Sequence, residues 1–424
     1  MNNSGNDLGV MNASHAAVSV GIRRWAAILA GAVVVCSSLH FWPWQGRRIW
    51  EVLAPANTLV LVWILSVGLW CIANRQWAFA AAIAPPVSLT AYVCIVILSV
   101  AFAPDSSRAA YYAGKLVLTA WGGYTLFACV ASNATGRRMV YGLFCLAVAV
   151  AVIGCLGARF IGTGDEFGFF RSALKYGTYL GMLVPLCAVW LMLARSWPVK
   201  LMGVGLVIAA VLSAGTVGCV MAIGAGLVAA ALAAPRWSWR LGFGGVLIAA
   251  MLSAAFWPGG WMGPLRRDAA IREAGGTHVR QRYIQWQAFI NLLEDRTVTG
   301  TGAGCVNEYR SAYYGRLPKL NTLAPFDENG YLVVADEGGM FALACLGWII
   351  VQHVAAAWRR ARRAWRRGDR RELRESLAAW AAMAGACLAN VFSAVQFNGI
   401  LIVFIAVLAL AGSGSDTEEV ACDY

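Results

Sequence analysis

Long apolar runs alternate with short polar segments along almost the whole chain. A run of about 20 apolar residues is long enough to cross roughly 30 Å of hydrocarbon as a helix. The boundary between the seventh and eighth runs, at SAGTVG, is the least defined of the set. We predict twelve spanning helices, over residues 25–43, 50–73, 78–103, 111–131, 139–157, 178–194, 201–215, 217–235, 241–257, 336–355, 377–395 and 398–412.

On one side of the predicted membrane bundle, two polar stretches are longer than a short connection between helices. One covers residues 158–177, and the other runs from about residue 258 to residue 335. The second contains RQRYIQWQAFINLLEDR at 280–296, which predicts an amphipathic helix with Tyr283, Trp286, Phe289, Ile290 and Leu293 on one face. We therefore expect three parts: a nine-span bundle over 1–257, an extracytoplasmic loop over 258–335, and three last spans with a tail over 336–424.

Composition agrees with the membrane pattern. Of 424 residues, 60% are hydrophobic and 13% are charged, and the mean hydropathy is +0.63. A soluble globule of this size needs more polar surface than such a chain can provide. The expected class is all-α, a polytopic membrane bundle with about twelve transmembrane helices and one long extracytoplasmic loop.

The net charge of +13 does not indicate nucleic-acid binding, because the basic residues are distributed among the short segments between apolar runs. With the amino terminus inside, eighteen basic residues fall on inner segments and seven on short outer ones. This excess satisfies the positive-inside rule and predicts that both termini are cytoplasmic. Nine of the eighteen are arginines in residues 358–376, read as a topological anchor or as a site for anionic lipid or a cytoplasmic partner.

Cysteine usage argues against disulfide and metal frameworks. Ten of the 12 cysteines fall inside apolar runs, where a thiol behaves as a small hydrophobe, and Cys305 alone lies in the long loop. No CxxC or paired Cys/His spacing is present, so we expect no metal site and no cofactor. The polar first twenty residues, followed by Arg23 and Arg24, indicate an uncleaved first span.

A glycine series follows the predicted amphipathic helix, in TVTGTGAG at 297–304. Such a series can cradle a phosphate when it precedes a helix. Here it comes after one, so ending the helix and turning the chain is the favoured interpretation, with phosphate binding as the alternative.

Four cationic residues are candidates for holding an anion. Arg280 and Arg282 begin the amphipathic helix, and their planar guanidinium groups match phosphate oxygens. Arg171 and Lys175, four residues apart, share one helix face, where like charges favour a bound anion or nearby acids. Ordinary surface arginines that reach lipid head groups remain the alternative.

Acidic residues gather in FDENGYLVVADEGG at 326–339, at the entry to the tenth predicted span. An unpaired carboxylate near hydrocarbon costs several kcal/mol, so Asp327, Glu328, Asp336 and Glu337 should have partners or a watery cavity. A carboxylate beside a cationic clamp can act as a general base on a sugar hydroxyl. Structural salt bridges to the arginines are the competing interpretation.

This layout resembles the superfamily of O-antigen ligases and of O-antigen or exopolysaccharide polymerases. Arg282, Trp286 and TGTGAG are similar to an arginine, tryptophan and GxGxG run, and GFFRSALKYGTYLGMLVP resembles the segment before the mid-chain span. ENGYLVVADEGG has the spacing of the family's HNxYLxxxxExG, with Asn329, Tyr331, Leu332, Glu337 and Gly339 at matching positions. Two positions depart from the family: Glu328 replaces its histidine, and Val217 stands where an arginine is common.

The resemblance implies glycosyl transfer from an undecaprenyl-diphosphate-linked oligosaccharide at the outer face of a bacterial inner membrane. Glu328, Arg282 and Arg280 are the expected catalytic residues, and the expected substrate-binding residues are Arg171, Lys175, Asp327, Asn329, Tyr331 and Glu337. The loss of the histidine favours a polymerase of repeat units. An O-antigen ligase acting on lipid A core and an exporter or flippase are the alternatives. Implied partners are the lipid-linked glycan, membrane lipids, and a chain-length regulator and flippase.

Overall fold

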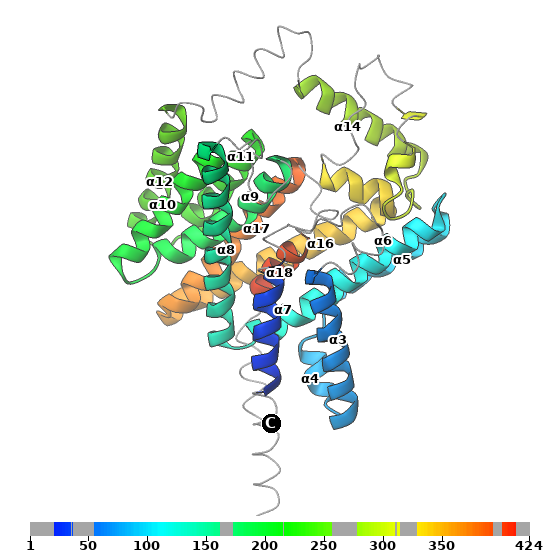
Figure 1. Ribbon diagram of the computed structural model, residues 1–424, viewed down its shortest axis with the longest axis horizontal. Coiled ribbons are helices and arrows are strands. Elements are labelled where there is room, and N and C mark those ends of the chain that lie inside the picture. Colours follow the sequence, from blue (N-terminus) through cyan, green and yellow to red (C-terminus); the bar gives the residue numbers. More distant parts are fainter. Residues whose placement is uncertain are drawn as a thin grey trace, which may run out of the picture.

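The computed structural model describes residues 21–34, 36, 55–161, 173–214, 216–256, 278–309, 312–313, 329–392 and 401–412. Within these ranges every regular element is a helix, arranged as a bundle (Figure 1). The predicted all-α class is confirmed for this part of the chain.

After a helix over residues 21–34, the first half of the chain forms successive apolar helices. Their bounds are α3 Pro55–Asn74, α4 Trp77–Ala82, α5 Val87–Ser99 with the 3-10 turn η1 Val100–Phe102, α6 Ser106–Leu116, the π-helical turn η2 Val117–Gly122, α7 Gly123–Ala131 and α8 Ala134–Ile161. Asp105 caps α6, since its side chain accepts a hydrogen bond from the backbone N–H of Arg108 at 2.9 Å.

The second half contains the remaining helices. They are α9 Ala173–Met192, α10 Trp197–Ser213, α11 Val217–Ala233, α12 Trp237–Phe256, α14 His278–Asp295, the 3-10 turn η3 Val306–Glu308, α16 Gly330–Arg367, α17 Arg370–Phe392 and α18 Leu401–Gly412. The uncertain boundary at SAGTVG is a true helix break, where the Thr216 side chain caps α11 by accepting from the N–H of Cys219.

Six helices are long and apolar enough to cross a membrane, at Ala56–Asn74, Ser106–Ala131, Ala134–Ala158, Leu174–Met192, Gly330–Arg367 and Arg370–Phe392. Shorter apolar helices cover Val87–Phe102, Trp197–Ser213, Val217–Ala233 and Leu401–Gly412. The predicted count of twelve spans is therefore not confirmed, although each predicted range overlaps a helix.

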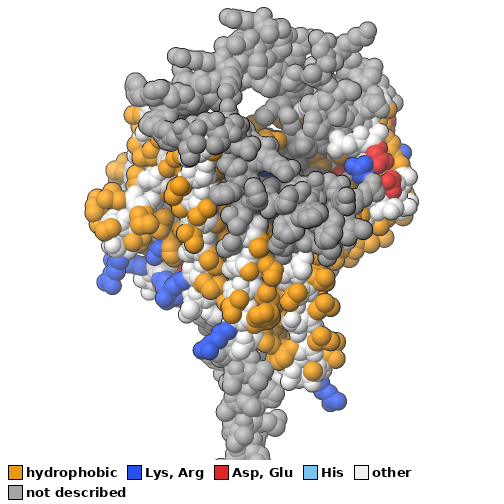
Figure 2. All heavy atoms as spheres, viewed as in Figure 1, with side chains coloured by type: hydrophobic (Ala, Val, Ile, Leu, Met, Phe, Trp, Pro, Cys, Tyr) orange, Lys and Arg blue, Asp and Glu red, His pale blue; other side chains and the backbone are white. Residues whose placement is uncertain are grey.

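The outer surface of the bundle is strongly apolar. Leu69, Ile153 and Leu232 are 68%, 69% and 74% exposed, respectively. Figure 2 shows hydrophobic side chains over much of the visible face, with Lys and Arg gathered at its lower edge. An apolar belt with a basic margin is the surface that a helical bundle presents to lipid.

The centre of the bundle is α9, packed against α11 and α17. The backbones of α9 and α17 approach closely at Gly385, where a Cβ atom would lie 2.2 Å from the carbonyl oxygen of Gly181. Small residues permit such close packing between apolar helices. α16 also packs on α17, and its first half lies beside α5.

Some arginines of the 358–376 segment are part of the internal structure. Arg360 is only 2% exposed, and its Nη1 donates to the carbonyl oxygen of Leu410 at 2.7 Å. Arg137 donates through Nε to Glu375 Oε2 at 2.8 Å, and both side chains are largely buried. The exposed arginines of the segment are Arg359, Arg362, Arg366, Arg367, Arg370 and Arg371. The segment therefore combines packing with a charged surface.

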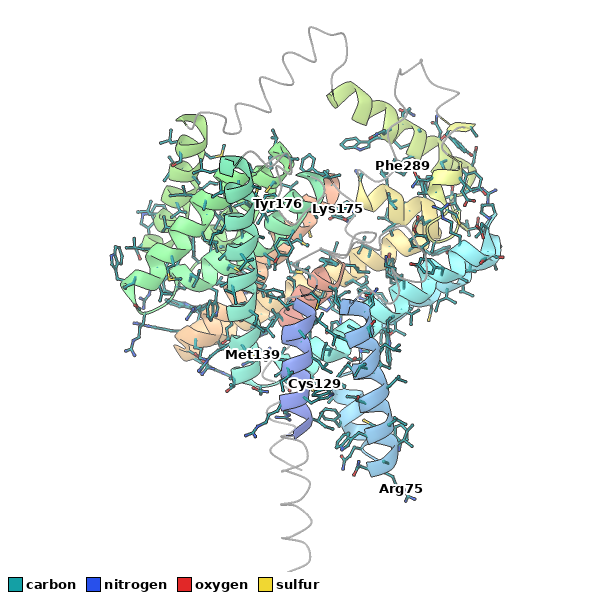
Figure 3. The ribbon with its side chains drawn as sticks, in the orientation of Figure 1. Arg75, Cys129, Met139, Lys175, Tyr176 and Phe289 are labelled. Carbon is teal, nitrogen blue, oxygen red and sulfur yellow. The ribbon has the colours of Figure 1, made fainter. Side chains whose placement is uncertain are left out.

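Figure 3 places Arg75 near the lower end of the described part of the molecule, whereas Lys175 and Phe289 lie towards its upper part.

Candidate functional site

The helix α16 is interrupted near its amino-terminal end. Gly339 has φ 74° and ψ −179°, a backbone conformation that only glycine adopts readily. Such a break removes hydrogen-bonding partners from the neighbouring peptide groups, which must then be satisfied elsewhere.

The missing partners come from residues 297–304, which we call the glycine loop. The N–H groups of Thr301 and Gly302 donate to the carbonyl oxygens of Asp336 and Glu337, at 2.7 and 3.0 Å. In return, the N–H of Met340 donates to the carbonyl oxygen of Thr297 at 2.8 Å. The glycine loop therefore packs directly against the break in α16, and we call this arrangement the seated state.

The glycines are required by this geometry. Gly300, Gly302 and Gly304 have φ values of 64°, 88° and 71°, and a Cβ on Gly304 would lie 2.1 Å from Cδ2 of Tyr112. The N–H of Gly300 donates to the carbonyl oxygen of Arg296 just after α14 ends. The series turns the chain, as the favoured interpretation predicts, whereas α14 already ends at Asp295, before the first of these glycines.

Glu337 is held by the same loop. The backbone N–H groups of Gly304 and Val306 hydrogen-bond to its carboxylate. The side chain is 8% exposed, and its Oε1 has no hydrogen-bond partner among the described residues. One carboxylate oxygen is therefore oriented by the loop, while the other can accept a hydrogen bond from a ligand.

Glu337 borders a cavity between the helices. Its walls come from α5, α6, the glycine loop, the first half of α16 and α18, and they consist of Tyr92, Val96, Tyr112, Lys115, Leu116, Ala303, Val334, Glu337, Gly338 and Leu401. The cavity carries two ionisable side chains, Lys115 and Glu337.

A second cavity adjoins the first, since Tyr92, Leu116 and Leu401 line both. The remaining wall of the second cavity is almost entirely apolar, with Leu89, Ala120, Leu346, Ile349, Ile350, Ala386, Phe404, Ile405 and Leu408, joined by Tyr331, Cys387 and Asn390. We call the first the polar cavity, because it contains Lys115 and Glu337, and the second the apolar cavity. A polar cavity next to an apolar one suits an amphiphilic ligand.

Cations surround Tyr112 at the edge of the polar cavity. The Lys115 Nζ lies 6.0 Å from the centroid of the Tyr112 ring, and the Arg108 Cζ lies 5.9 Å from it. Arg108 also forms a salt bridge with Glu308 at 3.0 Å, which ties α6 to η3 just beyond the glycine loop.

Cys305, the first residue after the glycine loop, is fully buried. Its Sγ lies 3.7 Å from the carbonyl oxygen of Asp105. Burial, together with the negative charge of Glu308, raises the pKa of Cys305 to about 11. The thiol is therefore neutral at physiological pH as long as the loop is seated.

Three predicted site residues lie along the first turns of α16. The Asn329 side chain caps the helix, since its Oδ1 accepts from the N–H groups of Tyr331 and Leu332 at 3.0 and 3.2 Å. The Tyr331 hydroxyl donates to the carbonyl oxygen of Cys387 at 2.9 Å and borders the apolar cavity. The structure thus brings Tyr331 and Glu337 to adjoining cavities, with Asn329 fixing the start of the helix that carries them.

The structure describes only some of the other predicted site residues. Lys175 is half-buried in the first turn of α9 and lines neither cavity. Arg280 and Arg282 lie near the start of α14, where the helical backbone alone is described. Arg171, Asp327 and Glu328 lie outside the described residues. Whether Arg282 and Glu328 converge stays a prediction.

The predicted amphipathic helix exists as α14, but its buried face differs slightly from the expected one. Gln285, Ala288, Phe289 and Leu292 are buried, whereas Ile290 is 40% exposed. Phe289 and Leu292 pack with Val306, Tyr313 and Val333. α14 packs against α16 and against the segment after the glycine loop. These contacts bury a face of α14 that does not include Ile290.

Lys115, one of the seven basic residues counted on the short outer segments, lines the polar cavity but was not among the predicted site residues. A signal was present, because Lys115 lies inside the apolar run predicted to span over 111–131. An ionisable residue within a spanning helix is costly and is functional by default.

A sequence profile of the O-antigen ligase family matches residues 201–347. The matched part runs from α10 into α16 and contains the glycine loop, Asn329, Tyr331 and Glu337. A comparison with curated proteins gave no match. The profile match confirms the resemblance to the O-antigen ligase and polymerase superfamily, and together with the apolar helices it indicates a bacterial membrane protein.

Proposed function

From the match of residues 201–347 to the O-antigen ligase family, we propose that this protein is a membrane glycosyltransferase that polymerises lipid-linked repeat units. The donor is an oligosaccharide on undecaprenyl diphosphate, and the acceptor is a sugar hydroxyl of a second glycan. The product is an exopolysaccharide or O-antigen chain.

The observation that carries this proposal is the pair of adjoining cavities beside the break in α16. The polar cavity, with Lys115 and Glu337, shares a wall with the apolar cavity. A lipid-linked sugar diphosphate has the same two-part character, because its head group is charged and hydroxylated while its tail is hydrocarbon. A binding site for it needs both environments side by side.

The proposed reaction is a single displacement at the anomeric carbon. The bond from that carbon to the diphosphate oxygen breaks, and its electron pair leaves with the diphosphate. The acceptor oxygen forms the new glycosidic bond, and its proton passes to a general base. Cationic groups stabilise the negative charge that develops on the diphosphate.

In this proposal Glu328 is the base, and Arg280 and Arg282 hold the leaving diphosphate. Arg171 and Lys175 provide further positive charge on the same side of the membrane. Asp327, Asn329, Tyr331 and Glu337 orient the glycans and the catalytic groups. The conformation of Glu337 between two backbone N–H donors supports an orienting role, since its position is fixed before a ligand arrives.

The proposed topology places this chemistry at the outer face of the inner membrane. The excess of basic residues on the predicted inner segments supports it, as does the separation of Arg75 from Lys175 and Phe289 in Figure 3. Both termini are then cytoplasmic, and residues 258–335 form the extracytoplasmic part between the bundle of 1–257 and the last spans of 336–424.

Ligation to lipid A core is the second candidate, favoured by the description of the matching family. The replacement of the family's histidine by Glu328 supports polymerisation instead. The two reactions share the donor and differ in the acceptor.

The test uses purified protein in liposomes, supplied with lipid-linked repeat units alone or with lipid A core added. A polymerase lengthens the lipid-linked glycan without any transbilayer gradient, a ligase modifies only lipid A core, and an exporter produces neither product. For a polymerase, Glu328→Gln lowers the rate by about 10²- to 10⁴-fold if Glu328 is the base. Wild-type rates from this variant would remove Glu328 from that role.

A further inference from the structure

Lys115 and Glu337 come from distant helices, α6 and α16, yet they line one cavity closed on another side by Ala303 of the glycine loop. We propose that this cavity binds the sugar-diphosphate end of the lipid-linked donor, with Lys115 at the diphosphate and Glu337 at a sugar hydroxyl. The inference rests on the proposed function and adds Lys115 and Glu337 to the residues that contact the donor.

Lys115 is suited to an anion by its surroundings. It is half-buried, and it shares the cavity with Tyr112 and Leu116 of its own helix and with Tyr92 and Val96 of α5. Attraction between charges strengthens when water is partly excluded, so an ammonium group in such a wall binds phosphate oxygens more strongly than a surface lysine does. Lysine acts here as a point charge and does not require a fixed ligand geometry.

Glu337 supplies a hydrogen-bonding group for the sugar. Its Oε1 has no hydrogen-bond partner in the described part of the chain. A sugar hydroxyl placed next to it can form a hydrogen bond with that oxygen. The cavity therefore offers one group to a phosphate and another to a sugar hydroxyl.

The glycine loop fixes the position of the carboxylate. Gly304 and Val306 donate to Glu337, while Gly302 and Thr301 donate to the main chain of α16 at the same level. Because the loop holds the backbone and the side chain of Glu337 together, the carboxylate does not have to be ordered when the ligand binds.

The apolar cavity gives the lipid part of the donor a place to continue. Tyr92, Leu116 and Leu401 form the common wall, and beyond them the lining is aliphatic and aromatic. An isoprenoid chain attached to a diphosphate at Lys115 would pass along this wall towards Ile349 and Leu408.

Binding of undecaprenyl diphosphate and of undecaprenol to the purified full-length protein tests the role of Lys115. The two probes differ only in the diphosphate. We expect Lys115→Met to weaken undecaprenyl diphosphate by about 10- to 100-fold, the range of one charge-assisted interaction, with little effect on undecaprenol. Lys115→Arg should restore most of the affinity, and Lys200→Met, beside Trp197 on α10, is the matched control.

A Lys115→Met protein that melts at the wild-type temperature and keeps the wild-type preference for the diphosphate would overturn the inference. If Lys115→Met does not fold, Lys115→Gln supplies the same comparison. Glu337→Ala should reduce the preference for glycosylated over unglycosylated undecaprenyl diphosphate, because the hydrogen bond to the sugar hydroxyl is lost. An unchanged preference would refute the role of Glu337.

Failure of this inference can be distinguished from failure of the proposed function. If the wild type makes no glycosidic bond in liposomes but Lys115→Met still loses the diphosphate, the site is a binding site and the enzyme proposal fails. If the wild type polymerises and Lys115→Met has the same KM for the donor, the enzyme proposal stands and the assignment of Lys115 is wrong. A correct assignment raises KM about 10-fold or more.

Discussion

Replacing Gly339 with alanine should release the glycine loop from α16. With φ 74° and ψ −179°, an L-residue at this position costs about 1–3 kcal/mol of backbone strain. In addition, the new Cβ would lie 2.2 Å from the carbonyl oxygen of Val298, so the loop and the helix cannot keep their present separation. Both penalties apply only while the loop is seated.

The seated state is held by the three backbone hydrogen bonds of Thr301, Gly302 and Met340, each of which contributes about 1 kcal/mol net. The backbone strain in Gly339→Ala alone, about 1–3 kcal/mol, therefore offsets a large part of the roughly 3 kcal/mol that these hydrogen bonds contribute. The ratio of unseated to seated loop should rise by roughly 5- to 150-fold before the steric contact is counted. The open form then becomes a substantial part of the population.

Labelling of Cys305 by a membrane-impermeant maleimide, measured by mass spectrometry, reports this opening. In the wild type the thiol is fully buried and its pKa is raised to about 11, so labelling at pH 7.5 is slow. In Gly339→Ala both exposure and thiolate content increase, and glycan polymerisation should fall because Glu337 loses its backbone donors. Gly347→Ala is the control, since a Cβ at that position of α16 meets nothing within 4 Å. Equal labelling of Gly339→Ala and wild type would refute the seating argument.

Three further predictions concern the same helices. The rate of wild-type Cys305 labelling should rise with pH only as the solution nears pH 11, because burial raises the pKa of the thiol. In Gly339→Ala the rise should centre near the ordinary thiol pKa of about 8.5. Identical pH profiles for the two proteins would contradict this prediction. Asn329→Ala removes the cap of α16 and should cost about 1 kcal/mol of stability, seen as a lower melting temperature that Asn329→Asp largely restores. Glu375→Ala should lower the free energy of unfolding by about 3–5 kcal/mol, because it leaves Arg137 buried without its carboxylate partner. The double variant with Arg137→Met should recover most of this loss. A double variant as unstable as the single one would argue against the ion pair.

Some features of the site could be predicted because they depend on neighbouring residues in the chain. The turn after α14 follows from the glycine series, since Gly300, Gly302 and Gly304 occupy conformations that other residues avoid. The helix at 278–295 follows from its apolar spacing, although its buried face was predicted one position away from the correct one. Glu337 was selected from a motif, and the structure shows it beside a cavity.

Other features depend on contacts between distant segments. The break at Gly339 is compatible with its sequence, but only the seated loop explains why the helix stops and resumes there. Lys115 joins Glu337 because α6 and α16 both lie next to α5, and no local pattern around Lys115 contains that information. The predicted partnership of Arg282 with Glu328 is of the same long-range kind.

The amino-acid sequence by itself determined that the chain forms apolar helices with polar connections, and on which connections the basic residues fall. Hydrophobic run length and charge are properties of a segment and its solvent, so they can be read one segment at a time. Tertiary structure alone decided which helices meet and which polar groups share a cavity. In helices that are apolar on nearly all faces, hydrophobicity does not mark the contact side, and packing shape and the few buried hydrogen-bonding groups select it instead.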